Sequence, residues 1–163
     1  LLHLARRDAG VAAASPNGPV DLDDIVLRVT RRWRADDRMA IDTTGVGPAQ
    51  VLGDAESLTR VVANLIDNAV RHATAEVRVT SEERGGQAIV TVTDDGPGIP
   101  PGEHDRVFER FTRVDTSRPA LTGGAGLGLA IAREIVEEHG GTLVVDGAYA
   151  SGARLVLTLP VSR

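Results

Sequence analysis

The chain has 163 residues, 42% of them hydrophobic, and a net charge of −5, which suits one domain of ordinary size with a packed core. Aromatic residues make up only 2%, so the core must be built from Leu, Ile, Val and Ala. The negative charge argues against a general nucleic-acid surface, and the lack of cysteine excludes disulfides and thiolate metal sites. No apolar run reaches the ~20 residues that a membrane span needs.

Composition divides the chain into three parts. Residues 1–9 (LLHLARRDA) have the character of the last turns of a helix that begins upstream, 10–19 form a Pro/Gly-rich linker, and 20–163 form the main domain. There, apolar residues at helical spacing predict three helices, at about 22–35, 54–72 and 127–139. Alternation predicts strands at 38–42, 49–52, 75–81, 88–93, 143–145 and 153–159. The third and fourth of these strands form a hairpin, and Asp54 caps the long helix.

One face of the helix 54–72 is polar. Asn64, Asn68 and His72 are four residues apart and therefore form one line, with Arg71 beside it. An amide oxygen suits Mg²⁺, and an arginine can bind phosphate oxygens in a forked geometry. Taken alone, the pattern fits capping or solvent-facing amides better.

Two glycine turns follow. The first, 94–100 (DDGPGIP), leaves a strand end, where an ionised Asp94 could accept a hydrogen bond from an exocyclic amine and the glycines allow close approach to a flat ring. The second, 124–128 (GAGLG), opens a helix and could bind an anion. Its spacing and poor preceding strand exclude a dinucleotide fingerprint, and the absence of lysine excludes a Walker loop.

Between the two turns, Phe108 and Phe111 lie on an otherwise polar segment with Arg110 and Arg113. This arrangement predicts a lid that packs down over a ligand. The alternative is that both phenylalanines belong to the core.

Four motifs thus stand in a fixed order: 64–69 (NLIDNA), 94–100 (DDGPGIP), 107–115 (VFERFTRVD) and 124–131 (GAGLGLAI). Over residues 20–160 the chain resembles the catalytic ATP-binding domain of bacterial sensor histidine kinases, from its N box to its second glycine box. The resemblance implies an α/β (α+β) two-layer sandwich of the Bergerat type, with a mixed sheet and three main helices on one face. It also implies ATP and Mg²⁺ as ligands.

The resemblance assigns a role to each motif position. Asn68 matches the asparagine that holds Mg²⁺, Asn64 the residue that helps order that site, and Asp94 the acceptor for the adenine amine. Arg113 matches the lid arginine that reaches the terminal phosphate, with Arg110 as second candidate. The other positions implied to contact the nucleotide are Arg71, His72, Gly96, Gly98, Ile99, Phe108, Gly124, Gly126, Leu127, Gly128 and Leu129.

Asn64 separates the subfamilies. In the related gyrase and MutL ATPases and in anti-sigma serine kinases, a glutamate in this place acts as general base. An amide cannot take a proton, whereas a histidine nucleophile needs no base because its neutral imidazole already has a lone pair. The chain is therefore expected to serve transfer of the γ-phosphoryl group to histidine. The alternatives are a related ATPase or serine kinase, and a degenerate domain that only binds.

The acceptor histidine is expected outside this sequence. None of His3, His72, His104 and His139 has the family's context, similar to His-Glu-Leu-Arg-Thr-Pro, so the 163 residues should bind ATP without phosphorylating themselves. The implied partners are the protein's own dimerisation and phosphotransfer domain, of which 1–9 would be the tail, and a response regulator. The implied setting is the cytoplasmic part of a homodimeric, membrane-anchored sensor, with no direct membrane or nucleic-acid contact by this part.

Overall fold

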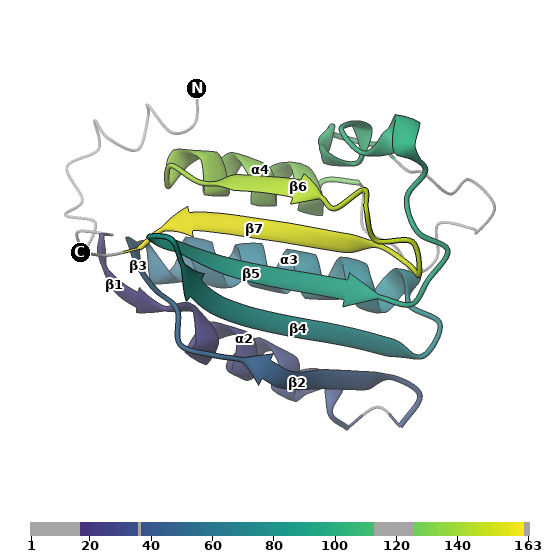
Figure 1. The fold of residues 1–163 in the computed structure, drawn as a ribbon, viewed down its shortest axis with the longest axis horizontal. Helices are drawn as coiled ribbons and strands as arrows, with labels where there is room; N and C mark the ends of the chain where they lie inside the picture. Colours follow the sequence, from purple (N-terminus) through teal and green to yellow (C-terminus); the bar gives the residue numbers. More distant parts are fainter. Residues whose placement is uncertain (1–16, 36, 113–125, 162–163) are drawn as a thin grey trace.

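The computed structural model describes residues 17–35, 37–112 and 126–161, which form a two-layer α/β sandwich (Figure 1). Five strands make a mixed sheet in the order β2-β4-β5-β7-β6, in which β2 runs parallel to β4 and all other neighbours are antiparallel. These strands are β2 (Ala40–Val46), β4 (Glu76–Arg84), β5 (Gln87–Asp94), β6 (Thr142–Val145) and β7 (Arg154–Pro160). The sandwich expected from the motifs is confirmed.

Three helices cover one face of this sheet: α2 (Leu22–Thr30), α3 (Ala55–His72) and α4 (Gly128–Glu138). The central helix α3 lies between the other two and packs on β4 and β5. Its buried side chains recur at helical spacing, as the sequence predicts: Leu58, Val61, Val62, Leu65, Ile66 and Ala69. The opposite side of α3 is left for polar residues.

The core is aliphatic, because alternate residues of the strands point toward the helices. Leu155, Leu157 and Leu159 on β7 are buried, while the residues between them are half-buried. Among the described residues, Phe108 is the one aromatic side chain in the buried core; the others there are Leu, Ile, Val and Ala. The composition therefore predicts the core chemistry correctly.

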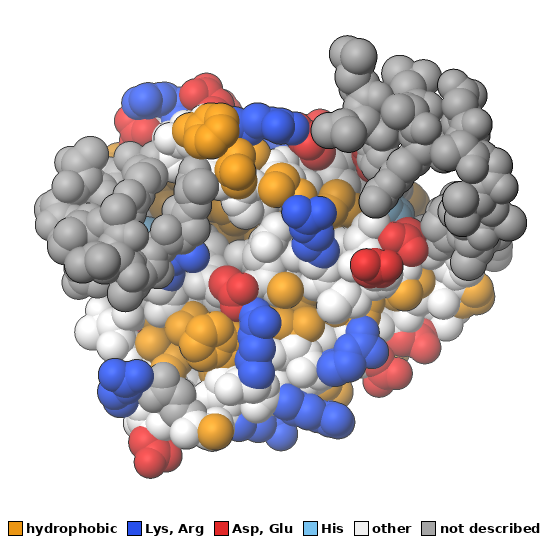
Figure 2. Space-filling model, turned by 180° about the vertical axis from the view of Figure 1, so that it is seen from behind, with side chains coloured by type: hydrophobic (Ala, Val, Ile, Leu, Met, Phe, Trp, Pro, Cys, Tyr) orange, Lys and Arg blue, Asp and Glu red, His pale blue; other side chains and the backbone are white. Residues whose placement is uncertain are grey.

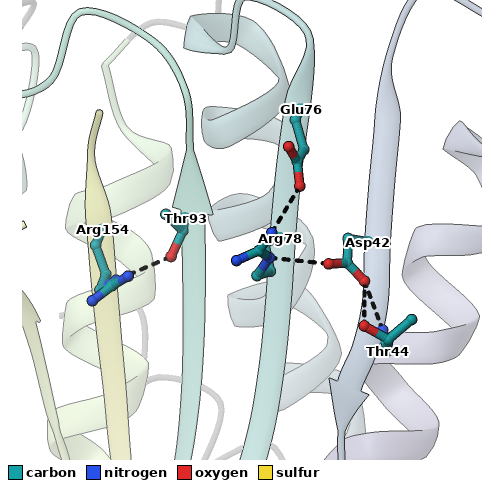
Figure 3. A network of polar contacts seen from close by, with 6 residues as sticks. All are labelled: Asp42, Thr44, Glu76, Arg78, Thr93 and Arg154. Carbon is teal, nitrogen blue, oxygen red and sulfur yellow. Dashed lines mark hydrogen bonds and ion pairs between the residues drawn. The ribbon is translucent and has the colours of Figure 1, made fainter. Parts of the chain in front are cut away.

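The other face of the sheet is polar. Arg154, Thr93, Arg78 and Asp42 stand in register across four neighbouring strands and form two hydrogen-bonded groups (Figure 3). Arg78 Nε donates to Asp42 Oδ2 at 3.0 Å, and Arg154 Nε donates to Thr93 Oγ1 at 3.2 Å. Cross-strand pairs of this kind stabilise a solvated sheet face modestly.

Some elements differ from the sequence prediction. A short strand, β1 (Gly18–Asp21), pairs antiparallel with β3 (Gln50–Gly53) in a separate two-stranded ribbon. The first helix ends at Thr30 and continues as a single 3₁₀ turn, η1 (Arg31–Trp33). The segment after β5 holds two more such turns, η2 (Pro101–Glu103) and η3 (Arg106–Phe108), outside the three helices predicted.

On the helical side, arginine side chains are interspersed with acidic and apolar ones rather than gathered in one field (Figure 2). None of the helices in the described ranges is long and apolar enough to span a bilayer.

The cap of α3 gives a first testable prediction. Asp54 Oδ2 accepts from Ser57 N at 2.9 Å. Hydrogen bonding from Ser57, its side chain first and its backbone N–H second, holds the pKa of Asp54 below its usual range. Asp54→Ala should lower the free energy of unfolding by about 1 kcal/mol at pH 7, and Asp54→Asn by much less, as measured by urea denaturation.

A depressed carboxyl pKa stabilises the fold only while the group is ionised. The difference between wild type and Asp54→Ala should therefore be complete above the unfolded-state pKa, about 4, and shrink as the pH falls through the lower folded value. An undiminished difference at pH 2 would contradict the cap as its cause.

Candidate functional site

The polar side of α3 faces the beginning of α4. Asn64 Nδ2 donates to the backbone oxygen of Gly128, the first residue of α4, at 3.0 Å. The amide nitrogen of Asn64 thus fixes α4 against α3. Leu127, the N-cap residue of α4, supplies no side-chain hydrogen bond, so the backbone N–H groups of the first turn stay available to an anion.

Asn68, one turn further along α3, is half-buried, and its side chain makes no hydrogen bond to the described residues. A half-buried amide without a partner is costly unless a ligand or water satisfies it. Its neutral oxygen suits a hard cation such as Mg²⁺, which needs few protein ligands because it keeps several waters and bridges phosphates. No cluster of three or more His, Cys, Asp or Glu suited to a metal occurs among the described residues.

Asp94 lies at the end of β5 and is only 4% exposed. Its Oδ1 accepts from the backbone N–H groups of Gly96 at 2.8 Å and Ala153 at 3.4 Å, whereas Oδ2 accepts no hydrogen bond from the described residues. Burial raises the pKa of this carboxyl, although the two backbone N–H groups oppose the shift. The arrangement leaves one oriented acceptor oxygen for a donor on a ligand.

The turn after Asp94 is packed so closely that two positions require glycine. A Cβ on Gly96 would lie 2.2 Å from the carbonyl oxygen of His72, at the end of α3. Gly98 has φ +79°, and its Cβ would lie 3.0 Å from the oxygen of Gly152. The turn therefore joins the ends of α3 and β5. That Gly96 and Gly98 also allow a flat ring to approach stays a prediction.

Sequence reasoning missed a third segment that packs against this turn, at Gly152 and Ala153. A Cβ on Gly152 would lie 1.9 Å from the carbonyl oxygen of Asp94, and the backbone N–H of Ala153 donates to the carboxylate of Asp94. His104 adds a bond from Nε2 to the oxygen of Ile99 at 3.0 Å and packs against Gly147. The available signal was a glycine directly before the last predicted strand, on a segment expected only to close the sheet.

The two phenylalanines of the predicted lid separate. Phe108 is buried, and the Arg133 guanidinium lies 5.0 Å from the centre of its ring, whereas Phe111 is 72% exposed and has φ 64°. The core alternative therefore fits Phe108 but not Phe111, and the lid stays a prediction. Arg110 forms an ion pair with Glu134 of α4 at 2.6 Å.

Of the second glycine turn, Gly126, Leu127, Gly128 and Leu129 lie within the described residues and lead into α4. Gly126 has φ +71°, and its oxygen accepts from Phe111 N at 3.0 Å. Leu129 packs against the core. Arg113 and Gly124 lie outside the described residues.

Arg71 lies three residues after Asn68 and therefore beside the polar line of α3. With Arg32, Trp33, Asp67 and Val70 it lines an open groove of about 560 Å³ between α3 and the end of α2. Figure 1 shows α2 and α4 on opposite sides of α3, so this groove lies on the α2 side, whereas Asn64 contacts α4. His72 is exposed at the last turn, next to Gly96.

Comparison with known proteins agrees with this geometry. Residues 53–163 match the family model described as histidine kinase-, DNA gyrase B- and HSP90-like ATPases. The chain is 40% identical to the signal transduction histidine-protein kinase/phosphatase MprB of Mycolicibacterium smegmatis, over all of this chain and 34% of the relative. It is 38% identical to the sensor-like histidine kinase SenX3 of the same species, over 86% of this chain and 38% of the relative.

Solved structures give the same result. The mycobacterial sensor histidine kinase MprB superposes with a TM-score of 0.76 at 39% identity, covering 88% of this chain and 97% of that one. The ATP-binding domain of PrrB from Mycobacterium tuberculosis gives 0.73 at 30% identity, covering 90% and 98%. The chain spans about a third of the length of the curated relatives named above. It belongs to the family of histidine kinase-, DNA gyrase B- and HSP90-like ATPases, as its motifs predict.

Proposed function

We propose that this chain is the catalytic domain of a sensor histidine kinase, which binds Mg²⁺-ATP and transfers the γ-phosphoryl group to a histidine on another domain. The observation that carries the proposal is Asn64, one turn before Asn68 on α3, whose amide donates to the first residue of α4. An amide in this position cannot act as a general base, so the site suits a nucleophile that needs no deprotonation before it attacks, such as a neutral imidazole nitrogen. The similarity to MprB and SenX3, both named histidine kinases, supports the same reading.

The base of the nucleotide would bind at Asp94. Its Oδ2 accepts no hydrogen bond from the described residues and belongs to a buried aspartate beside the turn of Gly96 and Gly98, so it would accept from the exocyclic amine of adenine. Gly98 and Ile99, further along the same turn, would also contact the base. His72, exposed at the end of α3, would lie beside the base or ribose.

The phosphates would bind between α3 and the beginning of α4. Asn68 would hold Mg²⁺, which neutralises phosphate charge as it develops during transfer. The backbone N–H groups at the start of α4, from Leu127 to Leu129, would bind phosphate oxygens. Arg113 and Arg110 remain the arginines proposed for the terminal phosphate, and Arg71 a more distant phosphate contact; use of Arg110 requires release from Glu134.

The reaction balances without a protein base. The lone pair of the acceptor imidazole nitrogen forms the new N–P bond, the bond between Pγ and the bridging oxygen breaks, and ADP leaves with that electron pair. The protein positions the two reactants and stabilises charge. The partners we propose are the protein's own dimerisation and phosphotransfer domain and a response regulator, in a homodimeric, membrane-anchored sensor whose kinase part is cytoplasmic.

The direct test is a transfer assay. The 163-residue chain, mixed with the separately purified phosphotransfer domain and γ-labelled ATP, should place acid-labile label on a histidine of that domain and none on itself. Free labelled phosphate without labelled protein would instead support the ATPase alternative.

Asn68→Ala should weaken Mg²⁺-ATP binding at least tenfold, about 1.4 kcal/mol, while leaving the melting temperature almost unchanged. The reason is that Asn68 makes no hydrogen bond to the described protein, so that its loss affects the ligand alone. Calorimetric titration would measure the affinity, and Asn17→Ala, at an exposed residue before β1, is the matched control. Wild-type affinity in Asn68→Ala would contradict the metal role.

Asp94→Asn should separate binding from stability. The amide can keep the Oδ1 bonds to Gly96 and Ala153 but would present a donor where the base needs an acceptor, so ATP affinity should fall at least tenfold. Because the raised pKa of Asp94 means that ionisation costs stability, that cost is absent at low pH and grows as the pH rises through the folded value. The variant should therefore melt at or above the wild-type temperature at pH 7; a lower one would contradict this account.

A further inference from the structure

The second aspartate of the turn 94–100 has contacts that the nucleotide does not explain. Asp95 Oδ1 accepts from the backbone N–H of Thr74 at 2.8 Å and of Ala75 at 3.1 Å, and Oδ2 lies 3.2 Å from Ala75 N. In the opposite direction, Thr74 Oγ1 donates to the backbone oxygen of Asp95 at 3.3 Å. One side chain thus ties the connection between α3 and β4 to the end of β5.

These contacts lie just after the C-terminal end of α3, where the chain leaves the hydrogen-bond pattern of the helix. The helix ends at His72, and Ala73 turns the chain with φ −59° and ψ 147°. The N–H groups of Thr74 and Ala75 then need acceptors outside the helix, and the Asp95 carboxylate supplies them. The backbone N–H groups of Ala75, Glu76 and Thr74, with Ala75 contributing most, hold the pKa of Asp95 below its usual range.

The next residue shows how little freedom the joint has. Gly96 follows Asp95 and lies directly against the carbonyl oxygen of His72, while the carboxylate of Asp94, the residue before Asp95, accepts from the backbone N–H of Gly96. Any movement of the end of α3 relative to β5 must therefore break the bonds of Asp95. Asn68 is one turn before that end.

We infer that Asp95 is a positioning residue of the nucleotide site, which fixes the end of α3 against the end of β5 so that Asn68 and Asp94 bind the two ends of one nucleotide at once. This inference rests on the proposed function. Asp95 itself touches neither base nor metal. Loss of the Asp95 side chain should weaken binding that uses Asn68 and Asp94 at the same time. Each of these two residues should still bind its own end of the nucleotide.

The test compares ATP affinity with Mg²⁺ and with EDTA in the 163-residue chain, by calorimetry. Asp95→Ala should lose about tenfold in Mg²⁺-ATP affinity but less than twofold in EDTA, where the base at Asp94 provides most of the binding. Asp95→Asn keeps an oxygen that can accept both N–H groups and should stay within about twofold of wild type in both conditions. A residue that merely stabilises the fold would lower both affinities alike.

Asp42→Ala is the matched control. Asp42 also accepts a backbone N–H and a hydroxyl, both from Thr44 at 2.9 and 2.7 Å, and its pKa is likewise lowered, but it lies on the polar sheet face away from α3 (Figure 3). It should leave both ATP affinities unchanged. Equal Mg²⁺-ATP affinity in Asp95→Ala and wild type would overturn the inference, as would equal losses with and without Mg²⁺.

Should Asp95→Ala unfold at the assay temperature, Asp95→Glu decides the question. It keeps the charge but displaces the carboxylate by one methylene, and the same Mg²⁺-selective loss is expected; unchanged affinity would overturn the inference. If wild-type protein shows no gain in affinity from Mg²⁺, the proposed metal role fails and the inference fails with it. A wild-type gain that survives in Asp95→Ala overturns the inference alone.

Discussion

The site depends on three backbone segments that meet around Asp94 with no space for side chains between them. Gly96 lies against the oxygen of His72, Gly98 against that of Gly152, and Gly152 against that of Asp94 itself. Backbone carbonyls cannot swing away as flexible side chains can. These contacts therefore hold the ends of α3 and β5 and the turn before β7 in one arrangement. The same arrangement sets the position of the polar side of α3.

Within that arrangement, two identical side chains on α3 have different tasks. The Asn64 amide nitrogen is engaged with Gly128 and sets the position of α4, whereas the Asn68 amide has no partner in the described protein. The fold therefore holds the Asn64 side chain in place, whereas the Asn68 side chain is the one proposed to bind a ligand. Chemical identity and helical spacing predict the line that both residues share, but only the neighbouring helix distinguishes them.

The sequence predicts what local patterns determine: the apolar spacing of α3, its Asp54 cap, the β4–β5 hairpin and the aliphatic core. It does not predict β1, because this strand is four residues long, buries only Val20 and forms through pairing with distant β3. It also treats Phe108 and Phe111 alike, although η3 and a positive φ at Phe111 send them to opposite environments. The contacts of Gly152 and Asp95 arise through space between segments far apart in sequence.

A buried carboxylate such as that of Asp94 would not be expected from the stability of the fold alone. Burying a carboxylate is unfavourable, and two backbone N–H groups on Oδ1 compensate only partly, since its pKa remains raised. A ligand donor on Oδ2 would stabilise the ionised form and lower that pKa again. Ligand binding and proton release from Asp94 are therefore thermodynamically linked. The free protein bears a cost at this residue that the donor group of a bound base would offset.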